Sequence, residues 1–146
     1  MKKITSVILV IALIFALAVT AMAAEIADCT VSADSVSAGK TVTVPVRITG
    51  NRGFTNFGIA LDYDREQLEL LSIQTAEGET PCLCGTMVAV NTQWTGTDEK
   101  TFGYVTAALE EAATADGILF TATFRVSGDF SGTAAVQPVV QYLSLI

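Results

Sequence analysis

The 146-residue sequence contains no histidine, and this absence removes the commonest forms of nucleophilic catalysis. A Ser-His-Asp triad and a Cys-His pair both need an imidazole to take the proton from the nucleophile. A structural zinc site is disfavoured as well, because three cysteines without a histidine are too few ligands. Most classes of esterase and protease are therefore excluded.

Cysteine is scarce, with Cys29, Cys82 and Cys84 only. Three cysteines are too few for a scaffold built on disulfides, and in an exported protein an odd number leaves at least one of them unpaired. A bridge from Cys29 to either Cys82 or Cys84 is one arrangement. We favour the other, in which the thiols are free and lie in the core or in a loop.

Basic residues are also few. Without Lys2 and Lys3, residues 24–146 keep six of the eight basic residues against all fifteen acidic ones, a net charge of −9. The sequence has no run of lysine or arginine. Nucleic acid and anionic lipid surfaces are therefore poor candidate partners.

The longest apolar run lies at the N-terminus. Lys2 and Lys3 precede the apolar segment from Val7 to Val19, and the small residues of Ala21-Met22-Ala23 follow it. This pattern predicts a signal peptide over residues 1–23, cleaved after Ala23. A retained anchor is disfavoured, since a bilayer span needs roughly 20 apolar residues. Residues 24–146 then form one secreted, extracellular domain.

Three segments alternate apolar and polar residues with period two, as half-buried strands do. In residues 41–49 the apolar set is Val42, Val44, Val46 and Ile48, and in residues 53–63 it is Phe57, Ile59, Leu61 and Tyr63. In residues 118–126 the inward set is Ile118, Phe120, Ala122, Phe124 and Val126. Pro45 has no amide hydrogen for a ladder, so the first strand should lie at a sheet edge or carry a bulge.

The remaining strands are shorter or less regular. Asp64 with Gln67 resembles a helix-start capping box, which predicts one helical turn followed by a strand. Residues 86–93, 101–109 and a last segment from Thr133 complete the set, and residues 74–85 and 110–117 are predicted loops. With a first strand near Cys29, about eight short strands indicate an all-β, antiparallel β-sandwich.

The acidic residues do not predict catalysis. Asp62 and Asp64 lie where a strand ends, so a solvated turn explains them, and the neighbouring Glu110 and Glu111 would point to opposite faces of a strand. The protein is predicted not to be an enzyme. Asp62, Asp64 and Glu66 lack a recognised calcium-ligand spacing, so no metal or cofactor is predicted.

One tryptophan, Trp94, stands beside a polar turn. A lone tryptophan at this place is more often a plug over the end of a core than a platform for sugar rings, because it buries a large area. The alternative function that it suggests is a carbohydrate-binding module of β-sandwich fold, with Trp94 and Tyr104 as the contacts.

Two segments carry a resemblance to a known family. "NFGIALDYDREQLELLSI" (56–73) contains Tyr63-Asp64 and Leu68-Glu69, and "ADGILFTATFRV" (115–126) contains Asp116-Gly117 and Phe124-Arg125. Together with "VSAGKTVTVPVRITG" (36–50), they resemble the cohesin modules of cellulosome scaffolding proteins. The likeness spans residues of about 29 to 137, and its motifs are mostly strand patterns with turn residues between them.

The resemblance implies a nine-stranded jelly-roll sandwich and a non-catalytic function. A cohesin holds a dockerin, a small calcium-loaded helical module carried by enzymes that degrade the plant cell wall. The family binds it on one flat sheet face, whose central strands would be residues 53–63, 102–110 and 118–126. The partner-binding residues expected there are Asn56, Gly58, Ala60, Asp62, Leu119, Thr121 and Thr123, with Glu110 or Glu111 as the family's outward glutamate.

Two departures from the family pattern stand out. Many type I cohesins have an acidic residue where this chain has Gly58, which leaves the class of dockerin open. The sequence also stops at Ile146, before the family's final strand. Either "VVQYLSLI" (139–146) replaces that strand, or the chain is truncated and the edge of the sheet is weakened.

Overall fold

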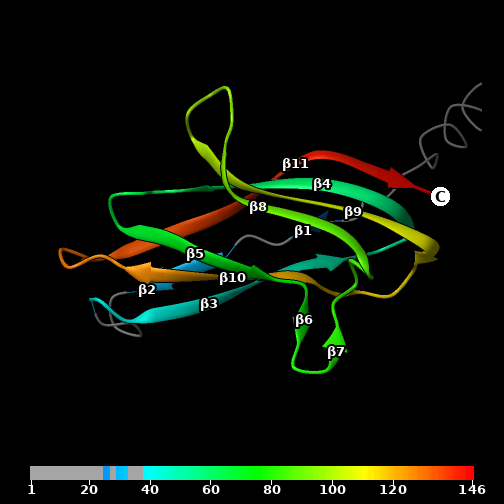
Figure 1. Cartoon of the computed structure of the whole chain (residues 1–146), viewed down its shortest axis with the longest axis horizontal. Coiled ribbons are helices and arrows are strands. Elements are labelled where there is room, and N and C mark those ends of the chain that lie inside the picture. The colour runs from blue at the N-terminus through cyan, green and yellow to red at the C-terminus, as the bar shows by residue number, and fades with distance from the viewer. Residues whose placement is uncertain (1–24, 27–28, 33–37) are drawn as a thin grey trace, which may run out of the picture.

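The computed structural model describes residues 25–26, 29–32 and 38–146 (Figure 1). The predicted signal peptide and its cleavage site lie outside the described residues. In the described part no helix is long and apolar enough to cross a membrane.

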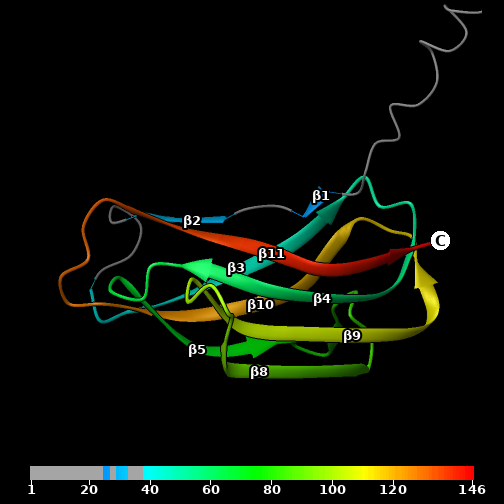
Figure 2. The ribbon, with the colours of Figure 1, turned by 90° about the horizontal axis from the view of Figure 1, so that it is seen from above.

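Two antiparallel sheets form the fold. The first contains β1 (Glu25–Ile26), β3 (Thr41–Thr49), β10 (Gly117–Val126) and β5 (Leu68–Gln74), in that order. The second contains β2 (Cys29–Ser32), β11 (Thr133–Leu145), β4 (Phe54–Tyr63), β9 (Thr101–Ala113) and β8 (Met87–Thr95). In Figure 1, β11, β4, β9 and β8 lie above β5, β10 and β3. Figure 2, a view from above, shows these upper strands side by side in the order that they have in the sheet. The predicted antiparallel β-sandwich of about nine strands is confirmed.

The core lies between the two sheets, where the predicted alternation places the apolar side chains. Val46 and Ile48 of β3 meet Ile59 and Leu61 of β4, and each is at most 1% exposed. Phe124 of β10 packs edge-to-face on Tyr63, with ring centroids 4.9 Å apart. Because both sheets turn one apolar face inward, the residues on the other faces are left to meet solvent or a partner.

Pro45 lies within β3 and pairs with Thr121 of β10. On the side away from β10, the described part of the chain pairs Ile48 and Thr49 of β3 with the short edge strand β1.

The segment after β4 forms one hydrogen-bonded turn and then β5. The Leu68 amide donates to the Asp64 carbonyl oxygen at 2.9 Å, and the Asp64 carboxylate accepts from the Glu66 amide at 2.8 Å and from the Gln67 side chain at 3.1 Å. The turn is not continued as a helix. The capping contacts therefore form as predicted, although they close a turn only.

Two predicted loops contain strand. The segment 74–85 carries the hairpin of β6 (Ala76–Glu77) and β7 (Thr80–Pro81). The segment 110–117 is strand up to Ala113, which pairs with Phe54 at the end of β9. Cys82 and Cys84 are free thiols and are buried, as favoured from the sequence. For Cys29 the structure describes the backbone only.

The grouping of three central strands in one sheet is wrong, because β10 belongs to the opposite sheet from β4 and β9. Leu119 was expected to point outward but is fully buried in the core. A bulge between Ile118 and Phe120 inserts one extra residue opposite β3, and such an insertion breaks the alternation. Thr121 and Thr123 face outward on the four-stranded sheet, and each donates a hydrogen bond of 3.2 Å to the Gln74 side chain.

Candidate interaction face

We define the outer face as the side of the five-stranded sheet that points away from the core. Its position follows from the strand register. Asn56, Gly58 and Ala60 alternate with the buried Phe57, Ile59 and Leu61 along β4, so they point outward. The residues that pair with them share their side of the sheet: Ala108, Thr106 and Tyr104 on β9, Tyr142 on β11, and, one strand further, Met87, Ala89 and Asn91 on β8.

Gly58 lies at the centre of the outer face, beneath two tyrosine rings. A β-carbon at this position would lie 2.5 Å from Cε1 of Tyr142 and would also collide with the Tyr104 hydroxyl. Real β-carbons essentially never approach other atoms so closely. Glycine therefore leaves the space over β4 that the Tyr142 ring and the Tyr104 hydroxyl occupy.

Gly58 and Ala60 themselves lie beneath the surface of the outer face. Gly58 is buried, and Ala60 is fully buried between its register neighbours Tyr104 and Val139. The prediction that these two small residues form the exposed surface is wrong in this respect. The bulkier side chains of the neighbouring strands lean over them and form the surface in their place.

The hydroxyl groups of Tyr104, Tyr142 and Thr106 lie together at the centre of the outer face. The Tyr142 hydroxyl forms a short hydrogen bond with the Thr106 hydroxyl. Burial and then the neighbouring Tyr142 raise the pKa of Tyr104, so its hydroxyl stays protonated at neutral pH. The centre of the face is thus an uncharged patch of rings and hydroxyl groups.

Trp94 extends this aromatic surface towards β8. Its ring packs on the Tyr104 ring, with centroids 5.3 Å apart and an angle of 32° between the planes. Trp94 is half-buried and does not belong to the core cluster. It therefore does not form the expected plug over the end of the core. The two rings face each other rather than standing apart as separate sugar platforms, which disfavours the carbohydrate-binding alternative at Trp94 and Tyr104.

A shallow hollow lies beside Tyr142. Asn56, Met87, Ala89, Thr106 and Ala108 line it together with this tyrosine. Met87 is 50% exposed and Tyr142 is 43% exposed, although both side chains are large and mostly apolar. Exposed residues of this kind, gathered around a hollow, are typical of a surface that meets a partner.

The charged residues lie at the two ends of the outer face. Asp62 is half-buried opposite Thr101, whereas Glu110 and Glu111 are exposed near the far end of β9. Asn56 and Asp62 therefore lie on the outward side of β4, and Glu110 and Glu111 lie near the end of β9, beyond Ala108. Leu119, Thr121 and Thr123 do not lie on the outer face.

Sequence reasoning missed Met87 and Tyr142. Strict alternation from the buried Val136 would place Tyr142 inside the sandwich. A bulge between Val140 and Tyr142 shifts the register by one residue, so Tyr142 turns outward and pairs with Gly58. No side-chain pattern in the sequence marks this bulge.

The described residues do not bring three or more histidine, cysteine, aspartate or glutamate side chains together as a metal site. The outer face therefore offers ring, hydroxyl and amide groups for non-covalent contact, and its described residues include no acid–base or nucleophilic pair.

Comparison with known proteins identifies a family. The model described as Cohesin domain matches residues 28–141. Comparison with curated proteins gives no match.

Several solved structures share the fold. The cohesin of the Coh-OlpA-Doc918 complex, a type I cohesin-dockerin complex from Clostridium thermocellum, is 20% identical with a TM-score of 0.61, over 80% of this chain and 82% of that one. The cohesin CaCohA2 from Clostridium acetobutylicum is 21% identical with a TM-score of 0.62, over 82% and 76% of the two chains. The sixth cohesin of scaffoldin B from Acetivibrio cellulolyticus, in complex with a Cel5 dockerin mutant, is 16% identical with a TM-score of 0.59, over 84% and 91%.

Proposed function

The chain belongs to the cohesin family, and from this we propose that it is a non-catalytic module whose outer face binds a dockerin. The dockerin would be carried by a secreted enzyme that degrades plant polysaccharides or by another scaffold protein. Binding of this kind assembles a cellulosome.

The observation that carries the proposal is the chemistry of the outer face. Its centre presents Trp94, Tyr104, Tyr142 and Met87 without a charged side chain, in a chain with fifteen acidic residues. The cores of protein interfaces are enriched in tyrosine, tryptophan and methionine and depleted of charge. A specific interface also needs about 800 Å² from each partner, which a face of four strands can supply and one loop cannot.

The related structures support the same assignment. The OlpA cohesin and the scaffoldin B cohesin were both solved in complex with a dockerin. A helical module needs a broad, level surface, and the tyrosine rings that lie over Gly58 and Ala60 provide one.

Calorimetry against the dockerin modules encoded in the same genome tests the proposal. Met87→Asp would bury a charge at the interface and Tyr142→Ala would remove a ring, so each should weaken binding by about 2 kcal/mol or more, roughly thirtyfold. Thr41→Asp is the matched control, since Thr41 is exposed on the four-stranded sheet. If Thr41→Asp abolished binding while the two outer-face variants bound normally, a different face would be the docking site.

We also propose that the domain of residues 24–146 acts outside the cell after removal of residues 1–23. The charged start, apolar segment and small residues before position 24 support this. The mass of the protein recovered from the medium of an expressing bacterium would give the mature N-terminus. A mass that includes residues 1–23 would contradict the proposal.

A further inference from the structure

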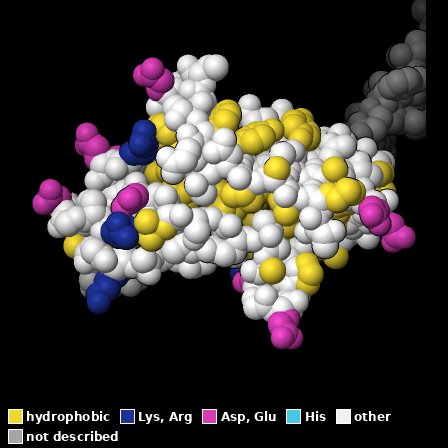
Figure 3. Space-filling view, in the orientation of Figure 1, with side chains coloured by type: hydrophobic (Ala, Val, Ile, Leu, Met, Phe, Trp, Pro, Cys, Tyr) yellow, Lys and Arg dark blue, Asp and Glu magenta, His cyan; other side chains and the backbone are white. Residues whose placement is uncertain are grey.

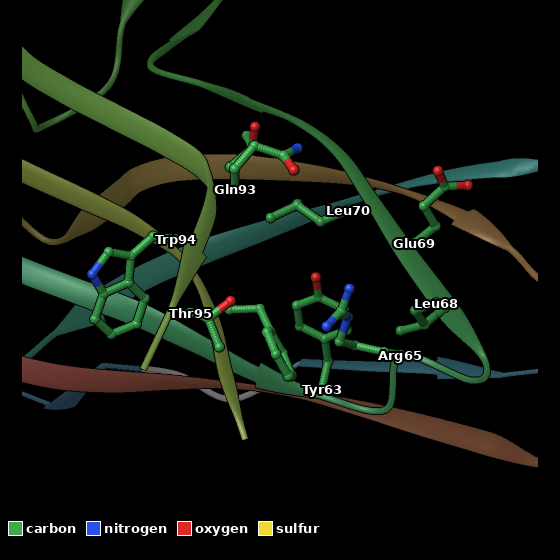
Figure 4. Close-up of a pocket in the computed structure, with 10 residues that line it drawn as sticks. Tyr63, Arg65, Leu68, Glu69, Leu70, Gln93, Trp94 and Thr95 are labelled. Atoms are coloured by element: carbon green, nitrogen blue, oxygen red, sulfur yellow. The ribbon is translucent and has the colours of Figure 1, made fainter. Parts of the chain in front are cut away.

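A second candidate site lies on the open side of the sandwich, away from the outer face. Here β5 and β8 are the edge strands of the two sheets, and a cavity of about 220 Å³ opens between them. Figure 1 views this side of the molecule, and Figure 3 shows hydrophobic side chains across its middle with acidic side chains at its margins. Figure 4 shows the residues that line the cavity.

The cavity combines an apolar wall with a rim of hydrogen-bonding groups. Leu68 and Leu70 of β5 contribute apolar surface together with Phe102. Gln93 and Thr95 approach from β8, across the opening from Leu70 (Figure 4). Both are exposed, so their amide and hydroxyl groups are accessible to a ligand.

Arg65 supplies the charge at this cavity. Its guanidinium carbon lies 4.5 Å from the centre of the Phe102 ring, which holds the side chain across the end of the core. In the described part of the chain the one ion pair joins Arg125 to Glu69 at 2.9 Å. Glu69, the carboxylate of the cavity, therefore already has a partner, whereas no carboxylate of the described residues forms an ion pair with Arg65.

Tyr63 lies next to Arg65 and is almost fully buried. Burial raises the pKa of its hydroxyl, which stays protonated at neutral pH as an uncharged hydrogen-bonding group. Trp94 belongs to the same stretch of β8, but Figure 4 shows its ring on the other side of the strand from Gln93. The cavity and the outer face are thus separate surfaces that meet at β8.

We infer that this cavity binds one pyranose unit of a saccharide, whether neutral or a uronic acid. A sugar ring has apolar C–H faces and a rim of hydroxyl groups, each of which donates and accepts hydrogen bonds. Leu70 and Phe102 match the apolar face. Thr95 and Gln93 can both donate and accept, and Arg65 donates only, so it selects an acceptor oxygen.

The size of the cavity suits one sugar ring. Pockets for drug-sized ligands measure about 300–1,000 Å³, and this cavity is smaller. The inference does not depend on dockerin binding, because the side chains proposed to contact the sugar do not lie on the outer face. Trp94 does lie on the outer face, and its ring points away from the cavity.

NMR titration of the ¹⁵N-labelled domain tests the inference with three probes: methyl β-xyloside, methyl β-glucoside and galacturonic acid. Saturable shifts are expected at the amides of residues 68–70 and 93–95. Preference for galacturonic acid would assign the Arg65 contact to a carboxylate, and equal binding would assign it to a hydroxyl or ring oxygen.

Two variants remove single hydrogen-bonding groups at the cavity. Thr95→Val and Arg65→Gln should each weaken binding about five- to tenfold, the usual effect of one lost hydrogen bond. The matched controls are Thr133→Val and Arg52→Gln, because Thr133 and Arg52 are exposed and do not line the cavity. All four variants should bind a dockerin as the unmodified domain does.

Three results would overturn the inference. The first is the absence of saturable shifts with all three sugars. The second is equal binding by Thr95→Val, Arg65→Gln and their controls. The third is a set of shifts that disappears with Tyr104→Ala but not with Thr95→Val, which would place the sugar on the outer face. None of these bears on dockerin binding, which calorimetry measures separately.

Discussion

Gly58→Ala is the smallest change that should separate the docking surface from the fold. One methyl group added at residue 58 would lie 2.5 Å from the Tyr142 ring and would overlap the Tyr104 hydroxyl. Both rings must then rotate away from β4. Tyr142 would also lose its present hydrogen-bond geometry with Thr106.

The expected effect on stability is small. Gly58 is not among the glycines with positive φ, so alanine can adopt its backbone conformation without strain. The atoms that must move are the ends of partly exposed side chains, and the backbone stays in place. Replacing glycine by alanine also lowers the conformational entropy of the unfolded chain, which stabilises the folded state by roughly 0.4–1 kcal/mol. This gain offsets part of the cost of moving the rings, so the free energy of unfolding should change by no more than about 1 kcal/mol.

The expected effect on binding is larger. Displaced rings no longer form a level surface, and aromatic side chains are the residues that most often dominate an interface. We expect dockerin affinity to fall at least tenfold, or about 1.4 kcal/mol. Near-ultraviolet circular dichroism, which senses the packing of tyrosine and tryptophan rings, should change together with the affinity.

Urea unfolding and calorimetry on the same preparation measure the two effects. Gly128→Ala is the matched control, since a β-carbon at residue 128 meets nothing within 4 Å and this glycine also lacks a positive φ. A Gly58→Ala variant that kept full affinity while its tyrosine signal changed would refute the view that these rings form the docking surface. Unfolding by several kcal/mol would refute the view that the rings can move independently of the sandwich.

The remaining predictions concern the core, the thiols and one turn. Phe124→Ala should lower the free energy of unfolding by about 3–5 kcal/mol in urea, because Phe124 is fully buried between the sheets. Burial, and then the neighbouring Cys82, raise the pKa of Cys84 to about 11, so a disulfide reagent at pH 8 should label it slowly in the native protein and rapidly in urea. Fast native labelling would contradict its buried position. Hydrogen bonds from the Lys100 amide and the Thr101 hydroxyl lower the pKa of Asp98 below its ordinary value of 3.8. The lowered pKa gives stability that is present above about pH 3.8 and is lost as the pH falls through the folded-state value. Asp98→Asn should therefore flatten the loss of stability at acid pH, and an unchanged acid profile would show that the turn from Gly96 to Thr101 does not depend on the charge.

The sequence predicted the strands well because burial of one face imposes a period of two. Residues 41–49 form β3 with the predicted bounds, and the inward residues of β4 are those expected. The prediction fails where an extra residue interrupts the period. Bulges at Leu119 and Gln141 change the face of the sheet to which the following residues point. Neither leucine nor glutamine is a residue type that marks a bulge in a sequence.

Assignment of a strand to one sheet or the other is a separate problem. Alternation in residues 118–126 shows which side meets a core, but both sheets have a core side, so the pattern fits either sheet. The pairing of β10 with β3 and β5 depends on contacts between residues far apart in the chain. For this reason the outward side of β4 was predicted correctly, whereas β10 was placed in the wrong sheet.

The exposed surface was harder to predict than the strands, because it depends on neighbours across the sheet. Asn56, Gly58, Ala60 and Asp62 lie on the outward side of β4 as expected, yet the two smallest are covered by Tyr104 and Tyr142. A small residue on one strand creates space that a large residue on the next strand fills. The pattern of a single strand identifies the face, and only the register with its neighbours identifies the atoms at its surface.

The same register indicates what the face selects in a partner. An acidic side chain at residue 58 would collide with both tyrosines and would add a charge at the centre of the face. In this chain the place is taken by the Tyr142 ring and the Tyr104 hydroxyl, with the Tyr142 and Thr106 hydroxyls bonded to each other. Asp62 lies at one end of β4, and the glutamates Glu110 and Glu111 lie near the end of β9 that is opposite it. We therefore expect the preferred dockerin to present small apolar and hydroxyl side chains at the centre of its helix and basic ones at the ends. Because salt screens exposed charges and leaves buried apolar contact largely unaffected, raising the ionic strength should weaken this complex only slightly. A steep decrease in affinity with salt would mean that the acidic ends, and not the tyrosine centre, dominate binding.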